Sequence, residues 1–151
     1  MTTARTHRII ALAALFLHAG CSAITEAESD LTRARLKWDR QRPAAYDYTL
    51  SHSCFCTVDV TRAVVIVVRG NVVENRTYSD NGAAVPAQYN DIFPTIDGMF
   101  AVIFNATDRN AARVDVAYDP AFGFPTRIAL DGSVKIADDE SWYTLTNFHI
   151  R

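Results

Sequence analysis

The pattern of apolar and polar residues predicts a helix near the beginning of the chain. Between residues 24 and 38 apolar side chains recur every three or four positions, which places them on one face of an α-helix. They are Ile24, Ala27, Leu31, Ala34 and Trp38. The charged residues between them form the solvated face. Pro43 ends this helix, because proline cannot continue its hydrogen bonds and constrains the preceding residue.

After this helix the pattern becomes that of β-strands. Residues 46–56 alternate and place every second side chain on one face. Residues 63–68 are almost all β-branched and predict a central strand that is buried on both faces. A turn at Arg69-Gly70-Asn71 lets the chain return over residues 71–78, which completes a hairpin.

A second helix is predicted to begin after Thr95, which is a suitable N-cap, with Asp97 near the positive helix end. Its predicted buried stripe consists of Ile96, Phe100, Ile103 and Phe104. Gly98 in the first turn costs about 1 kcal/mol relative to alanine, so a close backbone contact would explain it. Residues 83–93, before this helix, are expected to form a loop.

Three more strands are predicted in the last third of the chain, at residues 113–118, 126–130 and 142–150. Asp119-Pro120 opens the first connection, and Asp131-Gly132 predicts a hairpin turn followed by a short strand at Val134 and Ile136. The order α-β-β-β-α-β-β-β with short turns predicts the α+β class. We expect a mainly antiparallel sheet of about six strands with two helices packed on one face.

Residues 1–20 have the pattern of a signal peptide. Arg5 and Arg8 give a positive start, residues 9–17 are apolar, and small residues follow. The apolar run is too short to cross a bilayer, which needs about 20 residues in a helix. The pattern therefore predicts export of the remaining chain.

Ala19-Gly20-Cys21 resembles the lipobox of bacterial lipoproteins, in which the cysteine carries lipid and becomes the first mature residue. His18 stands where a lipobox usually has leucine, and Leu17 lies one place earlier. The resemblance implies a membrane-anchored lipoprotein of the bacterial cell envelope, with one domain over residues 21–151. The alternative is an ordinary signal peptide that releases a secreted or periplasmic protein.

The charge of the mature part excludes one class of partner. Removal of Arg5 and Arg8 leaves 13 of the 15 Lys and Arg residues against 17 Asp and Glu residues, a net charge of −4. A nucleic-acid partner would need a basic surface, so none is expected. The expected partners are the membrane, through the lipid anchor, and an unknown envelope protein or small ligand.

Cys54 and Cys56 are the most unusual residues of the mature chain. Once Cys21 carries lipid they are the only possible intramolecular pair, and an oxidising compartment favours a disulfide. Two residues along a strand span about 6.6 Å, near the upper limit for the Cα atoms of a disulfide. We therefore predict a disulfide that comes with a bend in the segment.

Two other interpretations of Cys54-Phe55-Cys56 remain. The usual redox signature has two intervening residues at a helix start, whereas this motif ends a strand. Alternatively, His52, Cys54 and Cys56 could bind a soft metal, because thiolates and imidazole suit Cu(I) or Zn²⁺. A structural zinc site needs a fourth ligand, and the only other mature histidine is His149. No other cofactor is expected.

The remaining polar residues carry no catalytic signature. The chain contains no G-x-S-x-G, H-E-x-x-H or phosphate-binding loop sequence. The acidic run at residues 138–140 could bind Ca²⁺, but it also fits a solvated turn. Three other acidic residues are expected either to pair with Arg113 or Arg127 or to cap turns. Those acids are Asp97, Asp115 and Asp119. We expect a non-enzymatic binding module; the alternative is a thiol–disulfide or soft-metal (Cu/Zn) handling protein.

Four segments together resemble a family of uncharacterised bacterial secreted proteins and lipoproteins, known as a domain of unknown function. They are SHSCFC at 51–56, PTIDGMF at 94–100, RVDVAYDPAFGFPTRIALD at 113–131 and IADDESWYTLTNF at 136–148. The resemblance implies an exported domain and no particular activity. His52 lies outside the family pattern.

Overall fold

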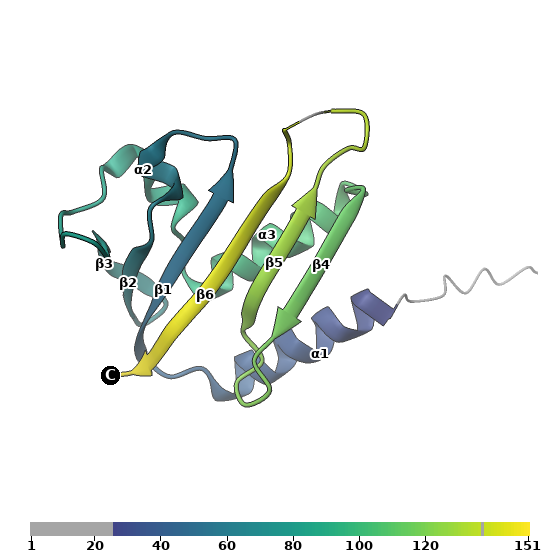
Figure 1. Cartoon of the computed structure of the whole chain (residues 1–151). Coiled ribbons are helices and arrows are strands. Elements are labelled where there is room, and N and C mark those ends of the chain that lie inside the picture. The colour runs from purple at the N-terminus through teal and green to yellow at the C-terminus, as the bar shows by residue number, and fades with distance from the viewer. Residues whose placement is uncertain (1–25, 137) are drawn as a thin grey trace, which may run out of the picture.

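The computed structural model describes residues 26–136 and 138–151 as a six-stranded antiparallel sheet with two long and two short helices (Figure 1). The elements are α1 (Glu26–Gln41), β1 (Ala45–Cys54), α2 (Val58–Thr61), β2 (Val64–Arg69), β3 (Val72–Tyr78), η1 (Ala87–Ile92), α3 (Ile96–Asp108), β4 (Arg113–Tyr118), β5 (Pro125–Asp131) and β6 (Ser141–Ile150). The predicted α+β class and antiparallel sheet are confirmed. In this part of the chain, no helix is long and apolar enough to cross a membrane.

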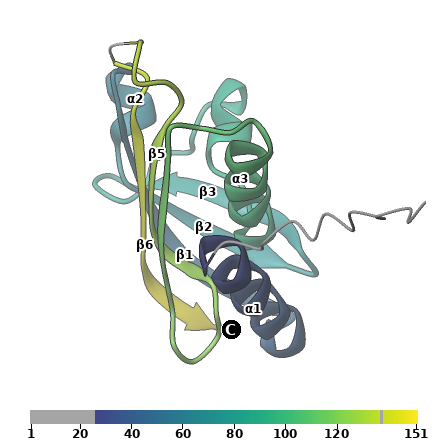
Figure 2. The same cartoon turned by 90° about the vertical axis from the view of Figure 1, so that its right-hand side faces the viewer.

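The strand order is β3-β2-β1-β6-β5-β4, so the first and last strands pair in the middle of the sheet. β2 lies next to the β3 edge, and its buried residues alternate with partly exposed ones. The prediction that this strand is central and buried on both faces is therefore wrong. In Figure 2, α1 and α3 lie on the same side of the sheet. Val64, Ile66 and Val68 are buried, whereas Val65 and Val67, which alternate with them, are only partly buried.

The core is centred on Trp38 of α1. This side chain is fully buried, and its ring meets Tyr46 and Phe124 edge-on at centroid distances of 5.5 and 6.1 Å. Leu31 and Ala34 of the predicted stripe are also buried. The position of Ile24 and the side chain of Ala27 lie outside the described residues.

α3 begins as the sequence predicts. The Thr95 hydroxyl accepts a hydrogen bond from the Gly98 amide at 3.2 Å. A Cβ at Gly98 would lie 2.5 Å from Cβ of Pro94, which is the close contact that explains this glycine. Met99 joins the buried stripe, while Phe104 is 39% exposed, contrary to prediction. At 100° per residue Phe104 lies about a quarter turn from the centre of the stripe.

Three connections differ from the sequence-based expectation. β5 ends at Asp131 but β6 begins only at Ser141, so there is no tight hairpin, and Val134 and Ile136 are exposed instead of forming a strand. The short helices α2 and η1 were not predicted, because helices of one turn have no apolar periodicity to reveal them.

Candidate functional site

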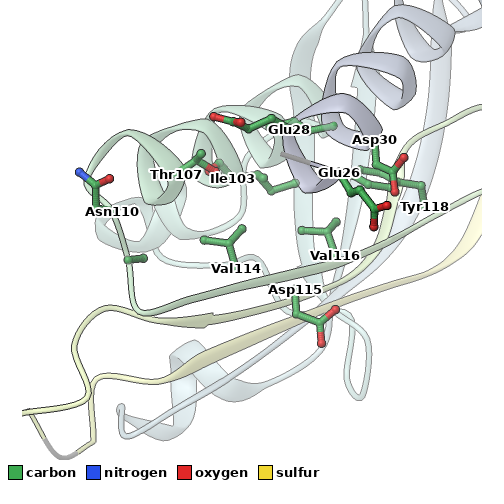
Figure 3. Close-up of a pocket in the computed structure, with 12 residues that line it drawn as sticks. Glu26, Glu28, Asp30, Ile103, Thr107, Asn110, Val114, Asp115, Val116 and Tyr118 are labelled. Atoms are coloured by element: carbon green, nitrogen blue, oxygen red, sulfur yellow. The ribbon is translucent and has the colours of Figure 1, made fainter. Parts of the chain in front are cut away.

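A hollow of about 630 Å³ lies between the first turns of α1, the end of α3 and β4 (Figure 3). Its floor is apolar: Val114 and Val116 of β4 point into it, while Asp115 points to the opposite side of the strand. Leu31 and Ile103 line its depth. This volume lies in the range of roughly 300–1,000 Å³ that is typical of ligand sites.

The rim of this hollow is acidic. Glu26, Glu28 and Asp30 come from α1, and the described residues that line the hollow include no lysine, arginine or histidine. Asp30 also pairs with Arg33 at 2.8 Å on the exposed side of α1, and this cation offsets part of its charge. The hollow therefore combines an apolar floor with a negative rim.

Tyr118 closes one end of the hollow. Burial raises its pKa to about 12, with a further contribution from the negative charge of Asp30. Beyond it lies a second hollow of about 380 Å³, which shares Tyr118, Val116 and Asp30 but is also lined by Arg33 and Lys37. Arg33 and Lys37 line only this second hollow, so the acidic character belongs to the first hollow, which is called the groove below.

Asp97 connects the two helices that form the walls of the hollow. Its carboxylate accepts hydrogen bonds from Arg35 at 2.8 Å, Arg42 at 2.9 Å and the indole N–H of Trp38 at 3.2 Å. The expectation that Asp97 pairs with Arg113 or Arg127 is therefore wrong.

The two other acids behave as the sequence predicts. Asp115 pairs with Arg113 at 2.9 Å. Asp119 caps the β4–β5 loop by accepting from the amides of Ala121 and Phe122. Gly123 in this loop has a φ of +83°, and a Cβ there would lie 2.6 Å from the Ala34 carbonyl oxygen, so only glycine lets the loop approach α1 so closely.

β4 forms an edge of the sheet. Within the described residues no other segment pairs with its outer side, so its outward backbone groups remain available as hydrogen-bond donors and acceptors. Because the hollow lies against this same strand, the groove offers both side-chain pockets and a free strand edge.

The predicted cysteine pair lies at the far end of β1. The sulfur atoms of Cys54 and Cys56 are at bonding distance, and their Cα atoms are 5.2 Å apart. The Cys56 amide donates to the Cys54 carbonyl at 2.9 Å, so the chain turns here and pairing with β6 stops at Cys54. Phe55 between them is 85% exposed. Oxidation of this pair in the exported protein stays a prediction.

His52 lies beside this pair and is only 8% exposed. Its ring stacks on Tyr143 with centroids 4.2 Å apart and planes inclined by 2°. Nδ1 lies 3.7 Å from Sγ of Cys54, and Nε2 is buried with no hydrogen-bond partner in the described part of the chain. Burial lowers the pKa of His52, which favours the neutral ring.

The predicted metal ligands are not gathered into a ligand set. In the described part of the chain no three His, Cys, Asp or Glu side chains are placed to hold a metal ion. Thiolates bind metals, whereas sulfurs bonded to each other cannot act as thiolates. His149 pairs with Asp47 at 3.3 Å, near the other end of β1. Cys21, the predicted lipid site, lies outside the described residues.

The structure defines the chain as an α+β protein in which an acidic groove follows the free edge of an antiparallel sheet. A family model described as a family of unknown function (DUF6174) matches residues 30–150, and the chain belongs to that family. A search of curated proteins and a search of solved structures found no match.

The groove was not predicted from the sequence. Its residues come from three distant segments, and acidic residues in the first turn of a helix are common because they suit the positive helix end. The sequence contains two features of the groove. Val114 and Val116 alternate with charged residues in a short strand, and three acidic residues lie close together at one helix end: Glu26, Glu28 and Asp30. Only the tertiary fold shows that these two features face each other.

Proposed function

We propose that this protein is a non-enzymatic, lipid-anchored envelope module that binds an extended segment of a partner protein along β4. The observation that carries the proposal is the apolar, acid-rimmed groove beside an unpaired strand edge. The partner segment would add a strand to the sheet and would carry apolar and basic side chains.

The free edge of β4 supports an extended partner. A peptide strand that adds to a sheet edge gains main-chain hydrogen bonds, and pockets for its alternate side chains give specificity. Val114 and Val116 face the groove at the spacing of alternate strand residues. Every second side chain of an added strand would therefore pack on the apolar floor.

The acidic rim supports basic side chains in that segment. Glu26 and Asp30 lie above the floor near Tyr118, so a lysine or arginine of the partner could reach a carboxylate while its neighbours pack on valine (Figure 3). Such rim contacts mainly raise the association rate and the specificity, and salt screens them.

The proposed anchor at Cys21 would hold the groove close to the membrane. Glu26 lies five positions after Cys21, a distance of at most about 18 Å for extended chain. The signal-peptide pattern of residues 1–20 and the sequence Ala19-Gly20-Cys21 support the proposed envelope location and lipid. The Cys21→Ser change should release the exported protein from membranes; a wild-type protein that is already unanchored contradicts this part of the proposal.

Binding can be tested with two end-blocked hexapeptides, one alternating lysine with valine and one alternating glutamate with valine. We expect the lysine peptide to bind at least tenfold more tightly by fluorescence anisotropy. Val116→Lys, which places a cation on the groove floor, should weaken binding at least tenfold.

Ala117→Lys is the matched control, because neighbouring residues of a strand face opposite sides of the sheet. It should change the affinity for the lysine peptide less than about twofold. Equal affinity for both peptides, or equal losses in the two variants, would contradict the proposed groove.

A further inference from the structure

We propose that the Cys54–Cys56 pair exchanges its disulfide with cysteine thiols of exported proteins, and that His52 donates a hydrogen bond to the departing sulfur of Cys54. This activity is independent of the groove, which lies beside β4. It assigns a role to His52, the one buried histidine among residues 26–136 and 138–151, which the proposed binding function does not use.

The two sulfur atoms differ in access. Cys56 is exposed and follows Phe55, which is 85% exposed, whereas Cys54 is partly buried at the end of β1. An incoming thiolate therefore reaches Cys56 first. The exposed Phe55 ring suits a partner whose cysteines are still unfolded, because such a chain also exposes apolar side chains.

Cys54 is the better leaving group because of His52. The Nδ1 atom lies 3.7 Å from Sγ of Cys54, while buried Nε2 has no hydrogen-bond partner among the described residues. The stacked Tyr143 ring holds the imidazole in this orientation. A neutral ring protonated at Nδ1 can donate its N–H to the sulfur, and a stabilised thiolate leaves faster.

The exchange balances as follows. A partner thiolate attacks Sγ of Cys56, the Cys54–Cys56 bond breaks, and Cys54 leaves as a thiolate that accepts a hydrogen bond from Nδ1–H of His52 and is then protonated by water. A second partner thiolate then attacks the partner sulfur of the mixed disulfide and frees Cys56. Two electrons pass from the partner dithiol to the pair. The reverse reaction, in which the reduced pair attacks a partner disulfide, restores the starting state, so shuffling needs no external oxidant.

The size of the closed loop favours exchange over a purely structural role. The two cysteines are only two positions apart. A cross-link stabilises a fold mainly by restricting the unfolded chain, and this restriction grows with loop length. So short a loop restricts the unfolded chain little, and the bond can open without loss of the sheet.

The test uses reduced glutathione as the thiol and N-ethylmaleimide to trap the sulfur that leaves. Peptide mass spectrometry should find glutathione on Cys56 and the maleimide on Cys54. His52→Phe keeps a ring against Tyr143 but removes the donor, and it should slow the reaction at least tenfold. His52→Asn, which retains an N–H donor, should recover part of the rate.

His149→Phe is the matched control, because it removes the exposed histidine that pairs with Asp47. Its rate should equal that of the wild type. Should His52→Phe fail to fold, His52→Asn and His52→Leu, which differ in the donor but hardly in size, provide the comparison. Glutathione found on Cys54, or equal rates with and without the donor at position 52, would overturn the proposal.

Discussion

β3 and β4 are the two edges of one antiparallel sheet, yet in the described part of the chain only β3 is covered by another segment. Residues 83–85 run along its outer side: the Tyr78 amide donates to the Ala83 carbonyl at 2.9 Å, and the Val85 amide donates to the Arg76 carbonyl at 3.1 Å. A bridge also joins Thr77 to Ala84. β4 has no such cover and borders the groove instead.

The difference supports the proposed place for a partner segment. An uncovered strand edge invites pairing with another chain, so proteins cover or block edges that serve no purpose. Here the chain covers the β3 edge with its own backbone. The β4 edge stays open beside an apolar floor, which is the arrangement needed to select one kind of added strand.

The largest expected effect comes from Asp97, which holds the two walls of the groove together. Asp97→Ala leaves Arg35, Arg42 and the Trp38 indole without their shared acceptor. The unfolding free energy should fall by about 2–4 kcal/mol, because the partners are partly buried. Urea denaturation measures this change, and binding of the lysine peptide should weaken with it.

Asp115→Ala is the control for this prediction, because it removes an exposed carboxylate that pairs with Arg113. It should change stability by less than about 0.5 kcal/mol. A similar loss in both variants would show that Asp97 does not hold the helices together.

The next largest effect is a loss of stability when the cysteine pair is broken. This pair lies at the end of β1, a central strand that is not at either edge of the sheet. Cys54→Ser should lower stability by no more than about 2 kcal/mol without abolishing folding, because the loop it closes is so short. Chemical denaturation with and without reductant measures this. The same protein should bind the lysine peptide normally; lost binding would mean that the two regions are coupled.

The sequence predicts those features that depend on neighbouring residues. The end of α1 before Pro43, the Thr95 cap and the Asp119 loop all follow from local chemistry and agree with the structure. The cover on β3 and the partners of Asp97 depend on which distant segments meet. No local pattern encodes them, so the expected pairing of Asp97 was wrong and the groove was missed.

A smaller effect is a difference in pH dependence between the two regions. Burial lowers the pKa of His52, so the unfolded chain binds a proton more readily and stability falls as the pH drops below about 6.5. His52→Phe should flatten this acid side. The pKa of Tyr118 is raised to about 12, so stability falls as the pH rises above about 10. Burial also raises the pKa values of Tyr46, Tyr48 and Tyr143, so Tyr118→Phe should make the alkaline side less steep without removing the slope.

Thermal melts between pH 5 and 11 separate these two effects. If stability falls with decreasing pH as steeply in His52→Phe as in the wild type, the His52 ring has the same pKa in the folded and the unfolded chain. An unchanged alkaline slope in Tyr118→Phe would show the same for the end of the groove.

The smallest expected effect is that of a single rim charge. Glu26→Gln should leave stability within about 0.5 kcal/mol, because it lies on the exposed start of α1. It should weaken binding of the lysine peptide about two- to threefold and make that affinity less sensitive to salt. Titrations at low and high salt measure both, and an unchanged salt dependence would exclude Glu26 from the binding rim.

Amide hydrogen exchange of the full chain, with and without saturating lysine–valine peptide, tests the central contrast between the two edges most directly. The account predicts slower exchange at residues 113–118, where an added strand would take up the outward amides, and unchanged exchange at residues 72–78. Failure of the peptide to slow exchange at 113–118, or equal slowing at both edges, would contradict it.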